Sequence, residues 1–178
     1  MVNLGNVMHI DTSAKLYERK HTGIAFKLVS DGSHKGLALR IQLKKELEKN
    51  LEANHDYARI YAICIYYLIK DDLNNFDTLV ICGDECFLYV KRYLDVLFSD
   101  CPEYFKKNVI SIGDLRKILG DNNLRSKANN IANSYRKRAL RTTHRQQKGI
   151  PLNVVRTNYT AVETKWIEIE EKLSSFTD

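Results

Sequence analysis

The sequence lacks a long hydrophobic run. Its longest apolar stretch, residues 60–69 (IYAICIYYLI), is about half the length that a bilayer-spanning helix requires. The N-terminal residues, MVNLGNVMHID, contain neither a basic start nor a long apolar stretch, so no export signal is predicted. We therefore expect a cytoplasmic protein without a membrane partner.

Two common site motifs are also missing. Cys82 and Cys86 are separated by three residues, but no second cysteine or histidine pair has the spacing of a zinc site. Together with Cys64 and Cys101 they are expected to be reduced, mostly buried thiols. No GxxxxGK[ST] sequence occurs, which argues against a P-loop ATPase.

Acidic residues are absent from residues 122–162. These 41 residues carry nine basic side chains: Arg125, Lys127, Arg136, Lys137, Arg138, Arg141, Arg145, Lys148 and Arg156. Because the whole chain has a formal charge of +6, the remainder has a charge of −3. This uneven distribution predicts an anionic polymer as partner, nucleic acid first, with a solvated helix face as the alternative.

The first part of the chain reads as an antiparallel meander. Strands are expected at residues 7–10, 23–29 and 37–43, where apolar side chains run together or alternate with polar ones. Asp31-Gly32 supplies the turn before the third strand. Residues 44–53 fit either a helix or an extension of that strand.

The second part alternates helices and strands. Asn54 is placed to cap the first of these helices. Because strand–helix repeats give parallel neighbours, we predict an α/β fold with a mixed sheet flanked by helices. The expected helices are residues 55–70, 85–98 and most of 115–145, the last interrupted at Gly120 and residues 121–123. The expected strands are residues 76–82 and 109–112.

A linker at residues 149–151 (GIP) divides the chain into residues 1–148 and a tail, residues 149–178. In the tail, Thr160 and Glu163 match a capping box. One face of the following helix is apolar, and one hypothesis is that this face forms a homodimer. The face comprises Val162, Trp166, Ile169 and Leu173.

Three aspartates occupy related places in this order. Asp11 is expected at the end of the first strand, Asp84 follows the fourth, and Asp56 opens the helix between them. If the first and fourth strands are parallel neighbours, their carboxyl ends meet at one edge of the sheet. Neighbouring carboxylates repel unless a cation neutralises them, and oxygen ligands suit Mg²⁺ or Mn²⁺. Taken singly, each aspartate is better explained as a turn or cap residue.

These segments resemble the ribonuclease H-like superfamily over about residues 7–140. IDTSAKLYERKHTGIAF is similar to its opening Asp-x-Ser strand and hairpin, and LVICGDECFLYVKRYL to its fourth strand, aspartate and helix. NHDYARIYAICIYYLIK resembles the start of its core helix, with Asp56 replacing the usual glutamate. LRSKANNIANSYRKRAL resembles its last motif, with Asn129 in place of an acid.

The resemblance implies a ribonuclease H-like fold and a metal-dependent nuclease. Asp11, Asp56 and Asp84 would bind Mg²⁺ or Mn²⁺, and Asn129 or Asp114 would complete the catalytic site. An RNA–DNA hybrid is the default substrate, with other duplexes as alternatives. Two further hypotheses are a non-catalytic nucleic-acid-binding module that has lost the fourth acid, and a protein-interaction module.

A basic helix is expected to hold the nucleic-acid backbone through phosphate contacts, which carry no sequence specificity. Tyr135 and His144 lie among its basic residues and either stack on bases or pack in the core. The expected nucleic-acid-binding residues are Arg136, Lys137, Arg138, Arg141, Arg145 and Lys148.

Overall fold

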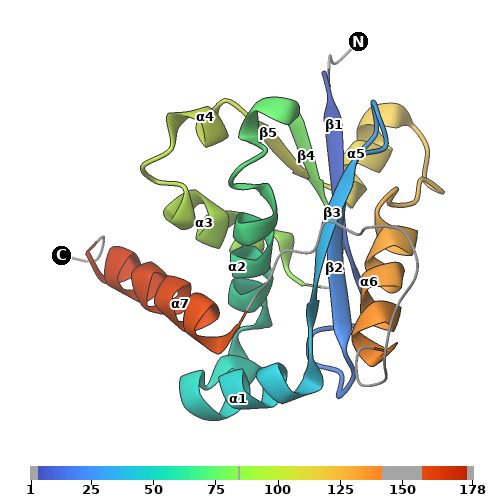
Figure 1. The fold of residues 1–178 in the computed structure, drawn as a ribbon. Coiled ribbons are helices and arrows are strands. Elements are labelled where there is room, and N and C mark those ends of the chain that lie inside the picture. Colours follow the sequence, from blue (N-terminus) through green and yellow to red (C-terminus); the bar gives the residue numbers. More distant parts are fainter. Residues whose placement is uncertain (1–3, 84, 142–157, 176–178) are drawn as a thin grey trace.

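Five strands form one mixed sheet in the order β3-β2-β1-β4-β5. The computed structural model describes residues 4–83, 85–141 and 158–175 (Figure 1). The first three strands are antiparallel, whereas β4 and β5 run parallel to β1, which confirms the predicted meander and parallel second half. The strands are β1 (Val7–Ser13), β2 (Thr22–Leu28), β3 (His34–Leu39), β4 (Thr78–Ile81) and β5 (Asn108–Ser111).

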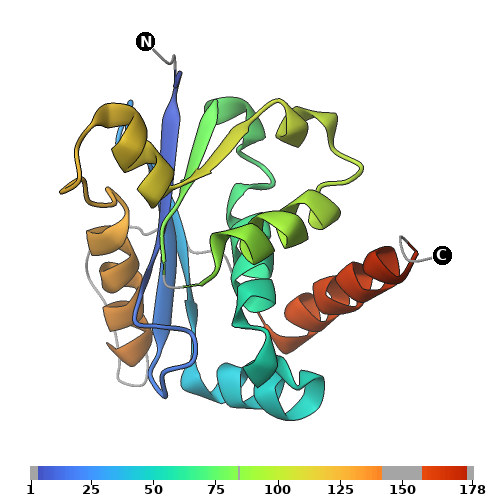
Figure 2. The ribbon, with the colours of Figure 1, turned by 180° about the vertical axis from the view of Figure 1, so that it is seen from behind.

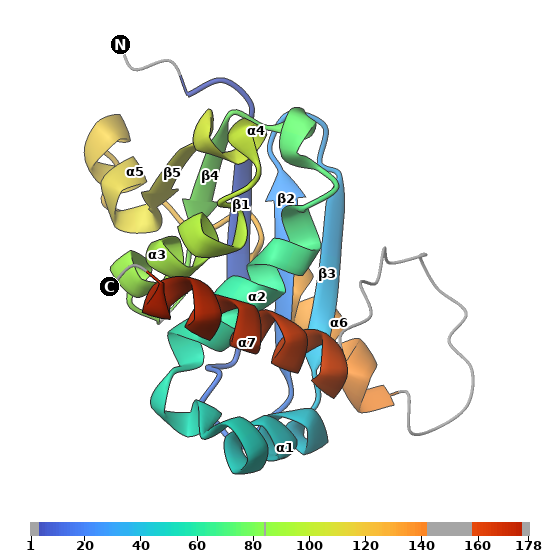
Figure 3. The ribbon, with the colours of Figure 1, turned by 90° about the vertical axis from the view of Figure 1, so that its left-hand side faces the viewer.

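Helices cover both faces of this sheet, as Figures 1 and 2 show from opposite sides. One face carries α2, with α3 and α7 beside it, and Figure 3 shows α7 crossing over α2. The other face carries α5 and α6, while α1 lies below the sheet and α4 precedes β5. The helices are α1 (Ile41–Leu51), α2 (Tyr57–Ile69), α3 (Phe87–Leu97), α4 (Pro102–Phe105), α5 (Ile112–Leu119), α6 (Asn129–Arg141) and α7 (Tyr159–Ser174).

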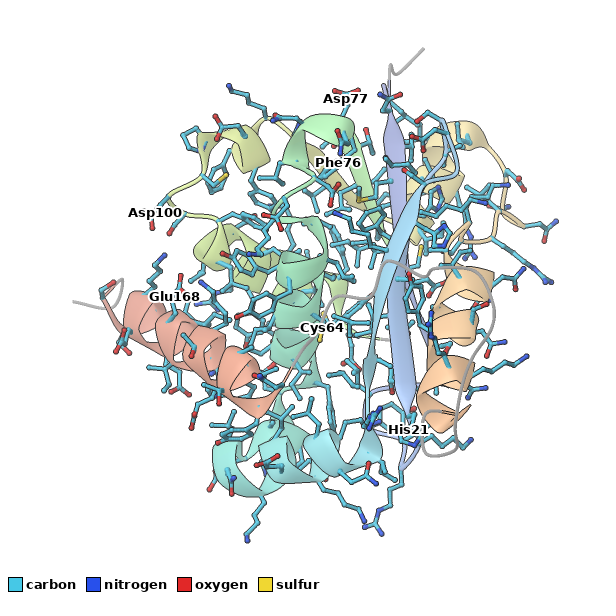
Figure 4. The ribbon with its side chains drawn as sticks, viewed as in Figure 1. His21, Cys64, Phe76, Asp77, Asp100 and Glu168 are labelled. Carbon is cyan, nitrogen blue, oxygen red and sulfur yellow. The ribbon has the colours of Figure 1, made fainter. Side chains whose placement is uncertain are left out.

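The main core lies between the sheet and α2. Met8 and Ile10 of β1 pack there with the buried side of α2, and Figure 4 shows Cys64 on the side of α2 that faces the sheet. Burial raises the pKa of the Cys64 thiol, so this cysteine remains protonated. Because sheet, α3 and α7 surround α2, nearly its whole circumference is apolar.

Helix α6 rests directly on the backbone of the opposite face. A Cβ atom at Gly23 would lie 2.0 Å from the carbonyl oxygen of Ala132, and one at Gly36 would lie 2.4 Å from the Tyr135 ring. Glycine is therefore required at both strand positions for this close approach. Tyr135 is buried beside Ala25, so of its two predicted roles the structure supports packing.

The tail helix shares the main core. Val162, Trp166 and Ile169 are buried there, so the apolar face that the homodimer hypothesis uses is covered within this chain. The predicted capping box was wrong. Asn158 caps α7 by accepting the Ala161 N–H at 2.9 Å.

Several element boundaries also differ from the prediction. Residues 44–53 are largely helical, because β3 ends at Leu39 and α1 begins at Ile41, whose N–H is accepted by Nδ1 of His21 at 3.2 Å. His21 lies at the lower end of the sheet in Figure 4. The predicted break in the run from residue 115 is confirmed: α5 ends before Gly120, which adopts a left-handed conformation with φ of 64°, and α6 begins at Asn129. Within the described residues, no helix combines the length and apolarity of a membrane span.

Candidate functional site

The parallel pairing of β1 with β4 builds the centre of the candidate site. Ile10 is in register with Ile81, and the N–H of Cys82 donates to the carbonyl oxygen of Ile10 at 2.9 Å. The chain then turns at Gly83, whose φ is 140°. Asp11 thus follows the residue that Cys82 contacts, and Asp84 comes two positions after Cys82. Asp84 itself lies outside the described residues.

Asp11 lies inside β1 rather than at its end, because the strand continues to Ser13. It is 9% exposed, and its Oδ1 accepts the Thr12 N–H at 2.8 Å. Strand alternation places Asp11 on the same face as His9 and Ser13, opposite the face that packs on α2.

That face of β1 meets the first turns of α6. Nδ1 of His9 accepts the Lys127 N–H at 3.5 Å, and Oγ of Ser13 donates to the carbonyl oxygen of Ala132 at 3.3 Å. In the sequence, Asp11 lies between His9 and Ser13, and Asn129 lies between Lys127 and Ala132. The structure therefore brings together the first and last segments of the ribonuclease H-like resemblance.

Tyr61 links α2 to the end of β4. Its hydroxyl donates to the carbonyl oxygen of Cys82, and a Cβ atom at Gly83 would lie 3.2 Å from its ring. Burial, then the charge of Asp11, raises the pKa of Tyr61 well above its ordinary value. Burial is also the main cause that raises the pKa of Cys82 to about 12. Both groups are therefore neutral at neutral pH.

Asp56 has the cap role that was its alternative explanation in the sequence, where Asn54 was also placed as a cap. It, and not Asn54, caps α2, since its Oδ1 accepts the Arg59 N–H at 3.0 Å. Its Oδ2 accepts Nε–H of Arg59 at 3.0 Å and the hydroxyl of Tyr93 at 2.5 Å. The guanidinium of Arg59 pairs with Glu170 at 3.0 Å as well. The carboxylate of Asp56 is thus engaged by one guanidinium, which it shares with Glu170, and by the Tyr93 hydroxyl.

Asp114 is likewise engaged as a cap residue. It accepts the hydroxyl of Ser111 at 2.7 Å, while Oγ of Ser111 accepts the Asp114 N–H at 3.1 Å. The Ser111 hydrogen bond lowers the pKa of Asp114 below its ordinary value. This reciprocal pair is a capping box that starts α5, and it accounts for an acidic residue at position 114.

A cavity of about 410 Å³ opens between the starts of α2 and α3. Sequence reasoning assigned only Asp56 of its lining to a site. The sequence held two signals for the rest of the lining. Glu85 directly follows Asp84, and Tyr89 and Tyr93 are one helical turn apart, which places them on the same face of α3. The lining residues are His55, Asp56, Tyr57, Ala58, Glu85, Cys86, Tyr89 and Tyr93.

The predicted basic helix is described only in part. Lys137 is exposed, whereas Arg136 and Arg138 are half-buried, and Arg136 donates to Oδ1 of Asn133 at 3.3 Å. Arg141 ends α6, but its side chain lies outside the described part, as do Arg145, Lys148 and His144.

The donor set for a metal ion depends on Asp84. Among the residues that the structure describes, no group of three or more His, Cys, Asp or Glu side chains is placed to hold a metal ion. Among the predicted ligands, Asp11 lies beside the end of β4, and Asp84 lies outside the described residues.

Comparisons of the chain with protein-family models, curated proteins and solved structures give no match.

Proposed function

We propose that the protein is a ribonuclease H-like nuclease that cleaves phosphodiester bonds with Mg²⁺ or Mn²⁺, with an RNA–DNA hybrid as the default substrate. The observation that carries this proposal is the parallel register of β1 and β4. It places Asp11 of β1 next to Cys82 of the neighbouring segment. Asp84 follows Cys82 by two positions in the chain. The strand order β3-β2-β1-β4-β5 supports it, because an antiparallel meander followed by parallel strands is what the family resemblance implies.

Asp11 and Asp84 are the proposed ligands of the ion. A bound divalent ion would polarise the phosphodiester group and lower the pKa of an attacking water molecule. Asp56 is assigned to the wall of the cavity, since Arg59 and Tyr93 already supply three hydrogen bonds to it. Asn129 stands at the start of α6, and Lys137 and Arg138 further along that helix would contact phosphates.

The test is cleavage of a labelled RNA–DNA hybrid in Mn²⁺ by the intact protein, with duplex DNA and single-stranded RNA in parallel. We expect Asp11→Asn and Asp84→Asn each to lower the cleavage rate by about 100-fold or more, because transition-state charge loses its stabilisation. The control is Asp71→Asn, since Asp71 is a surface residue whose side chain is 75% exposed. Its rate should equal that of the wild type. Cleavage that survives both site substitutions would contradict the proposal.

A nucleic-acid-binding module without catalysis is the second candidate. The engaged carboxylate of Asp56 and the amide at Asn129 favour it, because both reduce the number of acids for a second ion. In the same assay this candidate predicts no cleavage in Mg²⁺ or Mn²⁺, together with binding that weakens steeply as salt rises. Asp11→Asn would then leave binding unchanged or tighter, because it removes a negative charge near the phosphates.

A further inference from the structure

The cavity between the starts of α2 and α3 has an aromatic and acidic wall. Its lining includes three tyrosines and two acids, and among the described residues no lysine or arginine contributes to it. The negative faces of aromatic rings and the charge of carboxylates both attract a cation. We propose that this cavity binds an arginine side chain of a partner protein, a role separate from the cleavage of nucleic acid. The tyrosines are Tyr57, Tyr89 and Tyr93, and the acids are Asp56 and Glu85.

Two of the rings are held by carboxylates through their hydroxyl groups. Tyr57 donates to Oε1 of Glu48 at 3.0 Å, and the Tyr93 hydroxyl donates to Oδ2 of Asp56 at 2.5 Å. Rings fixed in this way lose little side-chain entropy when a flat cation stacks on them. Burial, then the hydrogen bond to Glu48 and the charges of Glu48 and Glu85, raises the pKa of Tyr57 to about 12. The negative charge of these acids thus acts at a ring of the cavity wall.

A guanidinium already lies against one of these rings within the chain. The guanidinium carbon of Arg59 is 5.3 Å from the centre of the Tyr93 ring and 4.1 Å from that of the Trp166 ring. Two carboxylates, those of Asp56 and Glu170, share this guanidinium, each at 3.0 Å. Because two negative charges face one positive charge, Arg59 leaves the wall without a net positive charge that would repel a second cation.

Tyr89 is the ring that a partner can reach. It is 56% exposed on the first turn of α3, and the neighbouring Leu88 is 73% exposed. Arginine suits this wall better than lysine, because its planar guanidinium stacks on aromatic faces and is more weakly hydrated than an ammonium group. A nucleobase also stacks on such rings, but its flanking phosphates would approach the acids of the wall. The charge of the wall therefore favours a basic protein segment over nucleic acid.

The experiment titrates the intact protein, with ¹³C-labelled tyrosine rings, with the peptide GGRGG and follows the ring resonances by NMR. The matched peptides carry lysine, or citrulline as the neutral isostere, in place of arginine. We expect GGRGG to shift the ring resonances saturably, the lysine peptide to bind more weakly, and the citrulline peptide to bind about tenfold more weakly. Tyr89→Ala should weaken GGRGG binding about tenfold, whereas Tyr89→Phe retains it, because the ring face contacts the cation. The control is Phe105→Ala, since Phe105 is 55% exposed on α4 and does not line the cavity.

Several results would overturn this inference. They are the absence of ring shifts with GGRGG, equal or tighter binding of the lysine or citrulline peptide, and an equal loss of affinity in Tyr89→Ala and Phe105→Ala. Tighter binding of the DNA pentanucleotide TTTTT than of GGRGG, lost in Tyr89→Ala, would assign the cavity to nucleic acid instead. Because none of these measurements involves cleavage, the arginine site and the proposed nuclease function stand or fall separately.

Discussion

His9 is a buried histidine that is neutral in the folded protein. It is 3% exposed on β1, and burial, then the charge of Lys127, lowers its pKa from 6.5 to about 4. Its Nδ1 accepts the Lys127 N–H, which fixes the segment before α6 against β1. At the residue scale, an uncharged imidazole thus joins the segment before α6 to β1, two positions from Asp11.

This histidine predicts how stability changes with pH. As pH falls from 6.5 to about 4, the unfolded chain takes up a proton at His9 and the folded chain does not. Stability is therefore lost over that window, by up to about 3 kcal/mol. Urea unfolding at pH 7, 5.5 and 4.5 measures the loss. His9→Gln, which retains an acceptor for the Lys127 N–H, should lose less stability than wild type over the same range.

The matched control is His55→Gln, since His55 is exposed. It should show the wild-type pH dependence. If His9→Gln and His55→Gln give the same slope as wild type, the buried histidine is not the source of the loss.

At the scale of elements, the packing of α6 on the sheet positions the last segment of the candidate site. Gly23 of β2 lies under the carbonyl oxygen of Ala132, where a side chain has no space. Sequence periodicity indicated a helix here but could not reveal this contact, because it joins residues over 100 positions apart. The same limit applies to α1. Leu37, Leu39, Ile41 and Leu43 alternate as in a strand, yet His21, just before β2, accepts the first helical N–H at Ile41.

Gly23→Ala should therefore displace α6 from β2. We expect it to reduce the free energy of unfolding by about 1–3 kcal/mol, as overpacking does. Gly113→Ala is the matched control, because a Cβ atom at Gly113 would meet only ordinary contact, 3.5 Å from Oγ of Ser111. This control should be neutral or more stable by up to about 1 kcal/mol. Equal effects of the two substitutions in urea unfolding would contradict the close contact.

At the scale of the whole molecule, the order of strands and helices followed from the sequence. Turn residues such as Asp31-Gly32 separate the meander strands, and strand–helix repeats give parallel neighbours, so the mixed sheet was predictable. The juxtaposition of β1 with the end of β4 followed from the same topology. The cavity beside it did not, because Glu85, Tyr57 and Tyr93 meet only when the starts of α2 and α3 pack together. The hydrogen bond from Tyr93 to Asp56 was equally hidden, since it joins the starts of two different helices, although the i,i+3 spacing of Asp56 and Arg59 was visible in the sequence.

The central claim is that Asp11 and Asp84 share a divalent ion at the β1–β4 edge. Mn²⁺ binding to the intact protein, measured by electron paramagnetic resonance at neutral pH, tests it most directly. The account predicts that wild type and Asp71→Asn bind Mn²⁺ with equal affinity and that Asp11→Asn weakens binding by at least about tenfold. An Asp11→Asn protein that binds Mn²⁺ as tightly as wild type would contradict it.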